Sequence, residues 1–265
     1  AKQKMIYPVD TNCPHDTKKL NFDEFALYDS AKKADVLQMI CIGTSGQDSQ
    51  DAVDFVTNKP GLWASVGLHP HDAKIGEDDL ETIARLAVDP KVVAIGEFGL
   101  DYYYDNSPRD DQIKALEYQL QLAISFGKPC VFHVREAFAD FWPIVDNFPG
   151  TRGVIHSFTA KKTEVDQSLK RGLMMGINGI MTFSKDIDQL EAARYIPLEK
   201  LLLETDSPFL TPAPLRGRMN EPANVRLVAA YLAEMRGETL DLLIEATTKN
   251  AQKLFSLDTN ELIYS

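Results

Sequence analysis

Four ionisable residues, spread over more than a hundred positions, each stand where an apolar, strand-like run ends. They are Glu97, His133, His156 and Asp206, and the runs that they end read VVAIGE, PCVFH, RGVIH and LLLETD. Imidazole and carboxylate groups are common ligands of divalent metal ions in hydrolases. If these runs are parallel strands of one sheet, their carboxyl ends meet at one face. The pattern predicts a divalent-metal site, although a lone strand-end histidine is more often structural.

The runs that must position these residues alternate with helical patterns. Short segments rich in Val, Ile or Leu, typical of buried strands, occupy residues 5–11, 36–44, 62–69, 92–100, 129–135, 153–158, 173–180 and 201–207. Amphipathic patterns predict helices over residues 21–34, 49–58, 78–89, 109–127, 135–148, 161–172, 187–196, 224–237 and 239–255. Eight such repeats over about 250 residues favour a (β/α)₈ TIM barrel of the metallo-dependent hydrolase type.

A doubly wound open sheet is the competing fold. Such sheets often carry a glycine-rich phosphate loop after the first strand, and the sequence NCPHDTKK at residues 12–19 has no glycine. In a barrel, the strand ends form one mouth, which would also receive His69 and His71 after the third strand. We expect a single domain over residues 1–265, because no linker interrupts the alternation.

Composition narrows the class of protein. The net charge of −11 argues against a general basic surface for nucleic acid, although a bound dication and local arginines could reverse the sign in a cleft. The three cysteines lack CxxC spacing, and we expect them to be reduced in a cytoplasmic protein, with Cys13 and Cys130 as ordinary buried thiols. No apolar run approaches the roughly 18 residues of a membrane helix.

Several motifs in order give the chain a specific resemblance. It resembles the TatD family of metal-dependent deoxyribonucleases, within the amidohydrolase superfamily, over almost its whole length. The matching segments are GLHPHDA (67–73), VVAIGEFGLDYYYDNSPRDDQ (92–112), FHVREA (132–137), IHSFTA (155–160), LLLETDSPFLTP (201–212), RGRMNEPANV (216–225) and TTKNAQKLF (247–255). The resemblance implies a metal-dependent nuclease, a 3′→5′ exonuclease on single-stranded or frayed DNA.

The resemblance also implies roles for the four strand-end residues. Glu97 matches the carboxylate that bridges two metal ions, and His133 and His156 match ligands of one of them. Asp206 matches the aspartate that binds the other ion and helps to activate the attacking water. We therefore expect Glu97 and Asp206 to be catalytic as well as ligating.

The first strand departs from the family pattern. The two histidines that usually hold the second ion are replaced by Asn12 and Pro14, and proline has no side-chain ligand. His15 could partly replace the pair, or the protein could have kept the fold and lost the activity. We favour one firmly bound ion, with a second arriving with substrate phosphate. That behaviour suits Mg²⁺, and Mn²⁺ or Zn²⁺ are alternatives.

Other residues at the predicted mouth could meet a nucleic acid. His69, His71 and Arg135 are candidates to protonate or bind the leaving oxygen, and Arg218 and Arg216 could bind the backbone. The run Tyr102–Tyr104 could stack on an unpaired base or simply pack beneath its loop.

Two other function classes are compatible with the sequence. One is a hydrolase of small amides, lactones or esters, and the other is a non-catalytic protein. A strand-5 lysine would have favoured the first, but position 133 is histidine. We expect a DNA substrate, no membrane, no obligate protein partner and a monomer.

Overall fold

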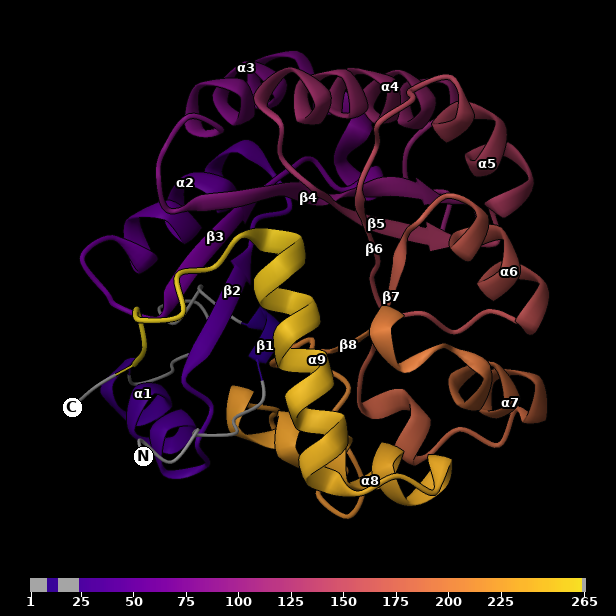
Figure 1. Ribbon diagram of the computed structural model, residues 1–265. Helices are drawn as coiled ribbons and strands as arrows, with labels where there is room; N and C mark the ends of the chain where they lie inside the picture. Colours follow the sequence, from indigo (N-terminus) through magenta and orange to yellow (C-terminus); the bar gives the residue numbers. More distant parts are fainter. Residues whose placement is uncertain (1–8, 14–23, 264–265) are drawn as a thin grey trace.

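The computed structural model describes residues 9–13 and 24–263, which form one curled sheet of eight parallel strands in the order β1 to β8 (Figure 1). The strands are β1 (Val9–Cys13), β2 (Gln38–Ile42), β3 (Leu62–Val66), β4 (Val92–Asp101), β5 (Cys130–Arg135), β6 (Gly153–Ile155), β7 (Met174–Ile177) and β8 (Leu201–Leu203). Parallel neighbours need a crossover connection, so a sheet in sequential order requires a helical segment between strands.

The helices supply these crossovers on the outside of the sheet. The α-helices are α1 (Glu24–Lys33), α2 (Gly46–Val56), α3 (Glu77–Leu86), α4 (Arg109–Phe126), α5 (Phe138–Asp146), α6 (Lys162–Lys170), α7 (Ile187–Tyr195), α8 (Val225–Arg236) and α9 (Leu240–Phe255). Short 3₁₀ helices are η1 (Pro70–Ile75), η2 (Gly179–Thr182), η3 (Leu198–Lys200) and η4 (Pro222–Asn224). The arrangement is a TIM-barrel-like α/β fold, as the alternation of patterns predicted.

Two predicted helix starts are wrong: α2 begins at Gly46, three residues before the predicted residue 49, and α5 begins later than predicted. The sequence pattern placed a helix over residues 135–148, but Arg135 is the last residue of β5 and α5 begins at Phe138. Arg135 pairs in register with Asp101 at the end of β4, which is longer than the apolar run suggested. The ladder between β4 and β5 therefore sets the start of α5, and a local pattern cannot show such a partner.

The curl of the sheet brings its first and last strands next to each other. Asp10 of β1 is fully buried and accepts hydrogen bonds from the backbone N–H and the hydroxyl of Thr205, at 2.9 and 2.6 Å. Thr205 follows β8 at its carboxyl end. Asp10 therefore braces the two ends of the sheet on the side where the strands end.

The apolar interior has two parts. One lies between the sheet and the outer helices. The other joins residues of seven strands to the C-terminal half of α9, and includes Ile40, Trp63, Val93, Val131, Val154, Met174, Leu202, Ala251, Leu254 and Phe255. Side chains from so many strands can reach one helix only if they face the interior of the curl. Several of them stand at the starts of their strands, so α9 covers the amino end of the sheet.

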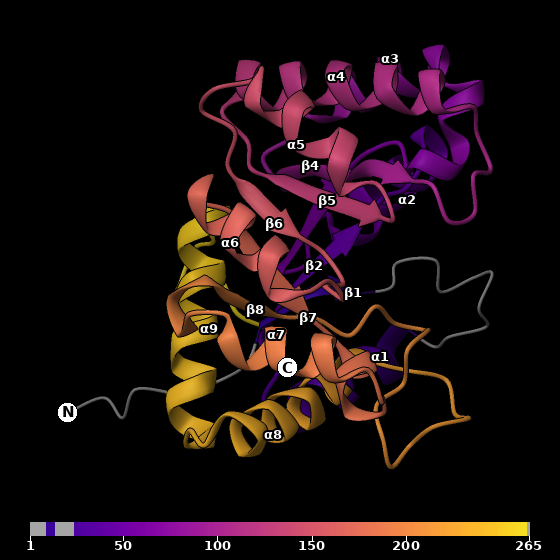
Figure 2. The same cartoon turned by 90° about the vertical axis from the view of Figure 1, so that its right-hand side faces the viewer.

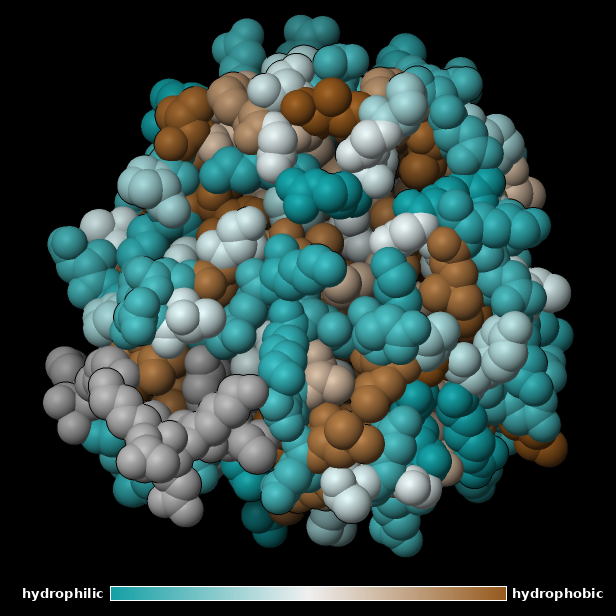
Figure 3. All heavy atoms as spheres, in the orientation of Figure 1, coloured by the Kyte–Doolittle hydropathy of each residue, from teal (hydrophilic) through white to brown (hydrophobic). Residues whose placement is uncertain are grey.

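The two ends of the sheet therefore differ. Figure 2 shows α9 on one side and the long loop between β8 and α8 projecting on the other. On the face that carries α9, apolar side chains lie scattered among polar ones (Figure 3). Among the described residues, no helix has the length and apolar character that crossing a membrane requires.

The cysteines differ from expectation in one respect. Cys130 is a free, buried thiol, and burial raises its pKa. Cys41 is disulfide-bonded, so the prediction that all three cysteines are reduced is wrong. Cys41 lies in β2 and its register partner in β1 is Cys13. The two positions are far apart in the sequence, and only the pairing of β1 with β2 brings them close together.

Candidate active site

Glu97 and His133 meet where two neighbouring strands, β4 and β5, approach their carboxyl ends. Nδ1 of His133 lies 2.9 Å from Oε1 of Glu97, and Nε2 of His133 lies 2.8 Å from Oδ2 of Asp101. Alternate residues of a strand face the same side, so Glu97 and Asp101, four positions apart on β4, can grip one ring. The imidazole of His133 is therefore held between two buried carboxylates.

His156 follows β6 and is held in the same manner. Its side chain is 3% exposed, and Nδ1 lies 2.8 Å from Oε2 of Glu204. Nε2 faces two other carboxylates, with Oε2 of Glu97 at 3.8 Å and Oδ1 of Asp206 at 3.7 Å. The contacts thus run from His133 through Glu97 and His156 to Asp206.

Both imidazoles share a feature of metal-binding histidines. One ring nitrogen faces Glu97, and the other pairs with a second buried carboxylate, Asp101 for His133 and Glu204 for His156. A metal-ligating histidine almost always gives its second nitrogen to such a partner, which fixes the orientation of the ring. Sequence reasoning missed Asp101 and Glu204, although both are carboxylates at the ends of apolar runs.

Glu204 reaches His156 only because of a glycine in β7. A Cβ atom at Gly176 would lie 1.7 Å from Oε1 of Glu204, which is well inside van der Waals contact. The other oxygen of Glu204 also accepts a hydrogen bond from the backbone N–H of Ser157, at 3.0 Å. Gly176 therefore provides the space in which a buried carboxylate stands behind His156.

Asp206 lies on a loop that several hydrogen bonds support. Its φ is +56°, a left-handed conformation in which aspartate is tolerated better than most residues. The side-chain amide of Asn220 donates to the carbonyls of Thr205 and Phe209, at 2.9 and 2.7 Å. Asp10 holds Thr205 from the other side. Asn220 thus braces the loop.

His69 and His71 stand beside the same carboxylates, at the start of η1. Nε2 of His69 lies 3.4 Å from Oε1 of Glu97, and Nε2 of His71 lies 3.0 Å from Oδ2 of Asp101. Together with His133 they offer three ring nitrogens within 4.8 Å of one another, a group that could hold a metal ion. Burial lowers the pKa of His69, which favours its neutral form.

The charges of the site are strongly coupled. Burial would raise the pKa of Glu97, but the charge of His156 and hydrogen bonds from His133 hold it well below its usual value. Burial would lower the pKa of His156, yet Glu204 and Glu97 raise it well above the ordinary value. Burial raises the pKa of Asp206 to about 6. Without a cation, the raised pKa values of His133 and His156 favour protonated imidazoles, whose charge offsets that of the carboxylates.

The donor set suits a divalent cation in place of those protons. The separations of 3.7 and 3.8 Å around Nε2 of His156 are too long for hydrogen bonds. They are close to the roughly 3.4 Å between ligand atoms around a tetrahedral ion with bonds of about 2.0–2.2 Å. Two positions are open to a cation, one along the contacts from His133 to Asp206 and one at the three-histidine group. The carboxylates behind His133 and His156 favour the first.

The predicted substrate-binding arginines have different surroundings. Arg135 is exposed at the end of β5, and its guanidinium carbon lies 4.0 Å from the ring centre of Tyr103. Arg218 is exposed on the loop after β8, where its carbonyl accepts a hydrogen bond from Thr211. Arg216 covers the ring of Phe183 at 3.8 Å. Of the three arginines, Arg135 is the one tied to the β4–α4 loop that borders the site.

The departure in the first strand stays a prediction. Pro14 and His15 lie outside the described residues, and so does the side chain of Asn12. The backbone of β1 is described, and this strand contacts β8.

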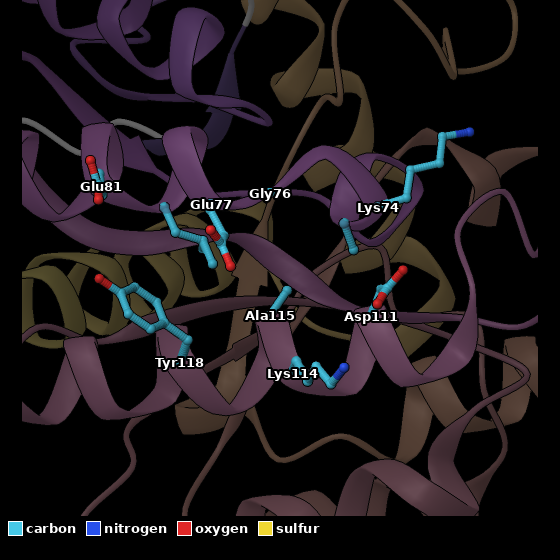
Figure 4. Close-up of a pocket in the computed structure, with 10 residues that line it drawn as sticks. Lys74, Gly76, Glu77, Glu81, Asp111, Lys114, Ala115 and Tyr118 are labelled. Atoms are coloured by element: carbon cyan, nitrogen blue, oxygen red, sulfur yellow. The ribbon is translucent and has the colours of Figure 1, made fainter.

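A groove of about 750 Å³ lies on the outer surface between η1, α3 and α4 (Figure 4). Its charged lining is mixed, with two lysines and three carboxylates: Lys74, Lys114, Glu77, Glu81 and Asp111. None of the four strand-end residues lines it. The groove is therefore distinct from the candidate metal centre, and its charge does not favour a polyanion.

Comparison with known proteins identifies the family. Residues 9–256 match the family described as TatD related DNase. The chain belongs to this family. It is therefore a metal-dependent hydrolase of the TatD family.

Individual relatives agree with the assignment to the TatD family. The chain is 34% identical over 262 residues to the uncharacterized metal-dependent hydrolase YcfH of Escherichia coli K12, covering 97% of this chain and 98% of the relative. It is 37% identical over 240 residues to the 3′-5′ ssDNA/RNA exonuclease TatD of Klebsiella pneumoniae, covering 87% and 90%. The crystal structure of YjjV, a TatD homologue of Escherichia coli, superimposes with a TM-score of 0.89, at 29% identity, over 96% of this chain and 100% of the other.

Proposed function

We propose that this TatD-family protein hydrolyses phosphodiester bonds with the help of a divalent metal ion, and that it removes nucleotides from the 3′ end of single-stranded or frayed DNA. The observation that carries the proposal is the continuous set of contacts His133–Glu97–His156–Asp206, with a buried carboxylate behind each imidazole. The relatives named as 3′-5′ exonucleases support the substrate class.

Glu97, His133, His156 and Asp206 are the residues proposed to hold the ion. Two imidazoles favour Zn²⁺ for a resident ion, whereas Mg²⁺ suits an ion that arrives with substrate phosphate. A bound divalent ion would polarise the phosphoryl oxygen and lower the pKa of a bound water. In the proposal one ion is held firmly, since the usual second pair of histidines is replaced by Asn12 and Pro14.

The proton from the attacking water goes to Asp206 in this proposal. Its carboxyl has a pKa of about 6 in the metal-free site, because burial disfavours its charge, so it is basic enough to accept a proton near neutral pH. Its position on a braced loop keeps the acceptor oxygen near His156. Glu97 stays ionised and holds the ring nitrogens of His133 and His156.

The leaving 3′ oxygen needs a proton or a positive charge. His71 is 30% exposed at the rim, and its Nε2 is anchored by Asp101. Arg135 presents a guanidinium on the same side, and its planar fork can donate two hydrogen bonds to one phosphate. We assign His71 and Arg135 to the leaving group and phosphate, and His69 to the support of Glu97.

A labelled oligonucleotide tests the proposal. A 5′-labelled single-stranded DNA, incubated with the protein and Mg²⁺, Mn²⁺ or Zn²⁺, should shorten stepwise from its 3′ end, and EDTA should stop the reaction. A matched RNA shows whether the substrate class extends to RNA. Glu97→Gln should abolish the ladder, and Glu199→Gln, an exposed carboxylate on η3, should not. A folded protein that cleaves neither polymer with any of these metals contradicts the proposal.

A further inference from the structure

The three consecutive tyrosines after β4 do not share one environment. Tyr102 is anchored, because its hydroxyl donates to Asp140 at 2.8 Å and the guanidinium carbon of Arg109 lies 4.0 Å from its ring centre. Tyr103 and Tyr104, in contrast, are 53% and 54% exposed. Their rings meet edge to face, with centres 4.9 Å apart. Two large aromatic surfaces are thus presented to solvent side by side.

The backbone of these two tyrosines is tied to the candidate metal centre through one carboxylate, that of Asp101. Oδ1 of Asp101 accepts the backbone N–H of Tyr103 at 3.0 Å and of Tyr104 at 2.9 Å. Oδ2 of the same carboxylate lies 2.8 Å from Nε2 of His133 and 3.0 Å from Nε2 of His71. The ring of His71 also lies 5.3 Å from that of Tyr104. The segment that carries the exposed rings is therefore held beside the site.

The guanidinium of Arg135 completes this aromatic surface. The guanidinium carbon of Arg135 lies 4.0 Å from the ring centre of Tyr103 and 4.9 Å from that of Tyr104. Arg135 is two positions after His133 on β5 and is exposed. A guanidinium stacked on aromatic rings keeps its edge free to donate to an anion. Aromatic faces and a phosphate donor thus stand together within reach of the reacting centre.

We propose that Tyr103, Tyr104 and Arg135 form a platform for one unpaired nucleobase and its phosphate, next to the bond that is cut. This inference deepens the proposed function and rests on it. Base stacking on an aromatic side chain tolerates any sequence, because every base has a π face, and it requires the base to be unpaired. The platform would therefore select single strands and frayed ends over intact duplex, without reading sequence.

Binding and hydrolysis test the platform separately. Binding is measured by anisotropy of a labelled single-stranded oligonucleotide whose terminal linkages are phosphorothioates, which resist cleavage. Replacing both tyrosines, Tyr103→Ala with Tyr104→Ala, should weaken binding about 10-fold. Tyr103→Phe with Tyr104→Phe should bind like the wild type, because the rings remain. Tyr118→Ala, a 43% exposed tyrosine on α4 that lines the groove in Figure 4, is the matched control and should change nothing.

A second substrate shows whether the rings contact a base. The second oligonucleotide is abasic at its last two 3′ positions. The wild type should bind it as weakly as the double-alanine protein binds the ordinary oligonucleotide. Equal affinity of the wild type and the double-alanine protein for the ordinary oligonucleotide overturns the platform. If replacing both tyrosines by alanine lowers the affinity for the ordinary and the abasic oligonucleotide by the same factor, the platform is overturned too, because the effect would then be structural.

Hydrolysis of the ordinary oligonucleotide separates this inference from the proposed function. The double-alanine protein should have a raised KM, with kcat reduced less. If the wild type cleaves and all variants match it in KM, the platform fails and the function stands. If the wild type binds through the rings but cleaves nothing, the function fails and the platform stands.

Discussion

At the scale of single residues, the orientation of His156 depends on Glu204. Replacing Glu204 by Gln keeps the shape but removes the charge that holds the Nδ1 proton. Loss of such an outer carboxylate costs about 10–100-fold in metal affinity or activity. We expect Glu204→Gln to lower both by that factor, in competition titrations with a metal indicator and in cleavage assays. Glu199→Gln on η3, which is exposed, should change neither quantity.

Neutralising Asp206 and neutralising Glu97 should have opposite effects on the free energy of unfolding of the metal-free protein. The pKa of Asp206 is raised to about 6 by burial, so its ionised form opposes folding at pH 8. A two-unit shift corresponds to about 3 kcal/mol at most. Asp206→Asn should therefore leave the free energy of unfolding unchanged or raise it. Glu97 has a depressed pKa and its charge stabilises the fold, so Glu97→Gln should lower that free energy.

Denaturant unfolding at pH 8 with EDTA measures both variants. Both should nevertheless lose hydrolysis, because each is proposed as a ligand. A large loss of stability in Asp206→Asn would mean that its carboxylate has a stabilising partner, and the proposed balance of charges would be wrong.

The replaced histidine pair can be tested by restoring it. Asn12→His with Pro14→His would add two imidazoles at the end of β1, which lies next to β8. If the second ion lacks ligands there, elemental analysis should show a higher ratio of metal to protein than in the wild type. Asn58→His with Pro60→His has the same spacing near the start of β3, away from the site, and is the control. An unchanged ratio would mean that this end of β1 does not form a second position.

At the scale of elements, α9 closes one end of the sheet and leaves the other to the site. Phe255 is 2% exposed and packs with strand residues at the amino end. Removing a buried aromatic ring typically costs about 3–5 kcal/mol. We expect Phe255→Ala to lower the free energy of unfolding by about that amount, while kcat measured well below the melting temperature stays near the wild-type value.

Leu242→Ala provides the comparison on the same helix. Leu242 is 50% exposed, so its truncation should change stability by less than about 0.5 kcal/mol. Loss of hydrolysis in folded Phe255→Ala would show that α9 also supports the site, against the separation of the two ends.

At the scale of the whole molecule, the imidazoles couple folding, protons and metal. Burial would lower the pKa of His133, but hydrogen bonds to Asp101 and Glu97 raise it to about 9. A raised histidine pKa stabilises the fold below the unfolded value of about 6.5, and this contribution is lost as pH rises through the folded value. The metal-free protein should therefore lose stability between pH 6.5 and about 9.

Thermal melts over that pH range, with and without EDTA, measure the effect. The metal-loaded protein should show a flatter profile, because metal ligands are already deprotonated and binding strengthens as protons leave. His133→Gln should flatten the metal-free profile. A metal-free protein whose stability rises between pH 6.5 and 9 would contradict the assigned charges.

The sequence by itself determined the architecture and the types of groups at its active end. The alternation of apolar runs and amphipathic patterns is local information, and it predicted the order of strands and helices. Glu97, His133, His156 and Asp206 could be singled out because each ends an apolar run. Ordered motifs were enough to indicate the TatD family, which the comparison confirmed.

Only the tertiary structure decided which groups face each other. Asp101 stands behind His133, Glu204 behind His156, and Asp10 against Thr205, 195 positions away. These pairs depend on strand register and on the curl of the sheet, and residue type or periodicity carries no trace of either. The start of α5 and the disulfide at Cys41 escaped prediction for the same reason. Local pattern fixes elements, whereas contacts between distant elements fix the chemistry of the site.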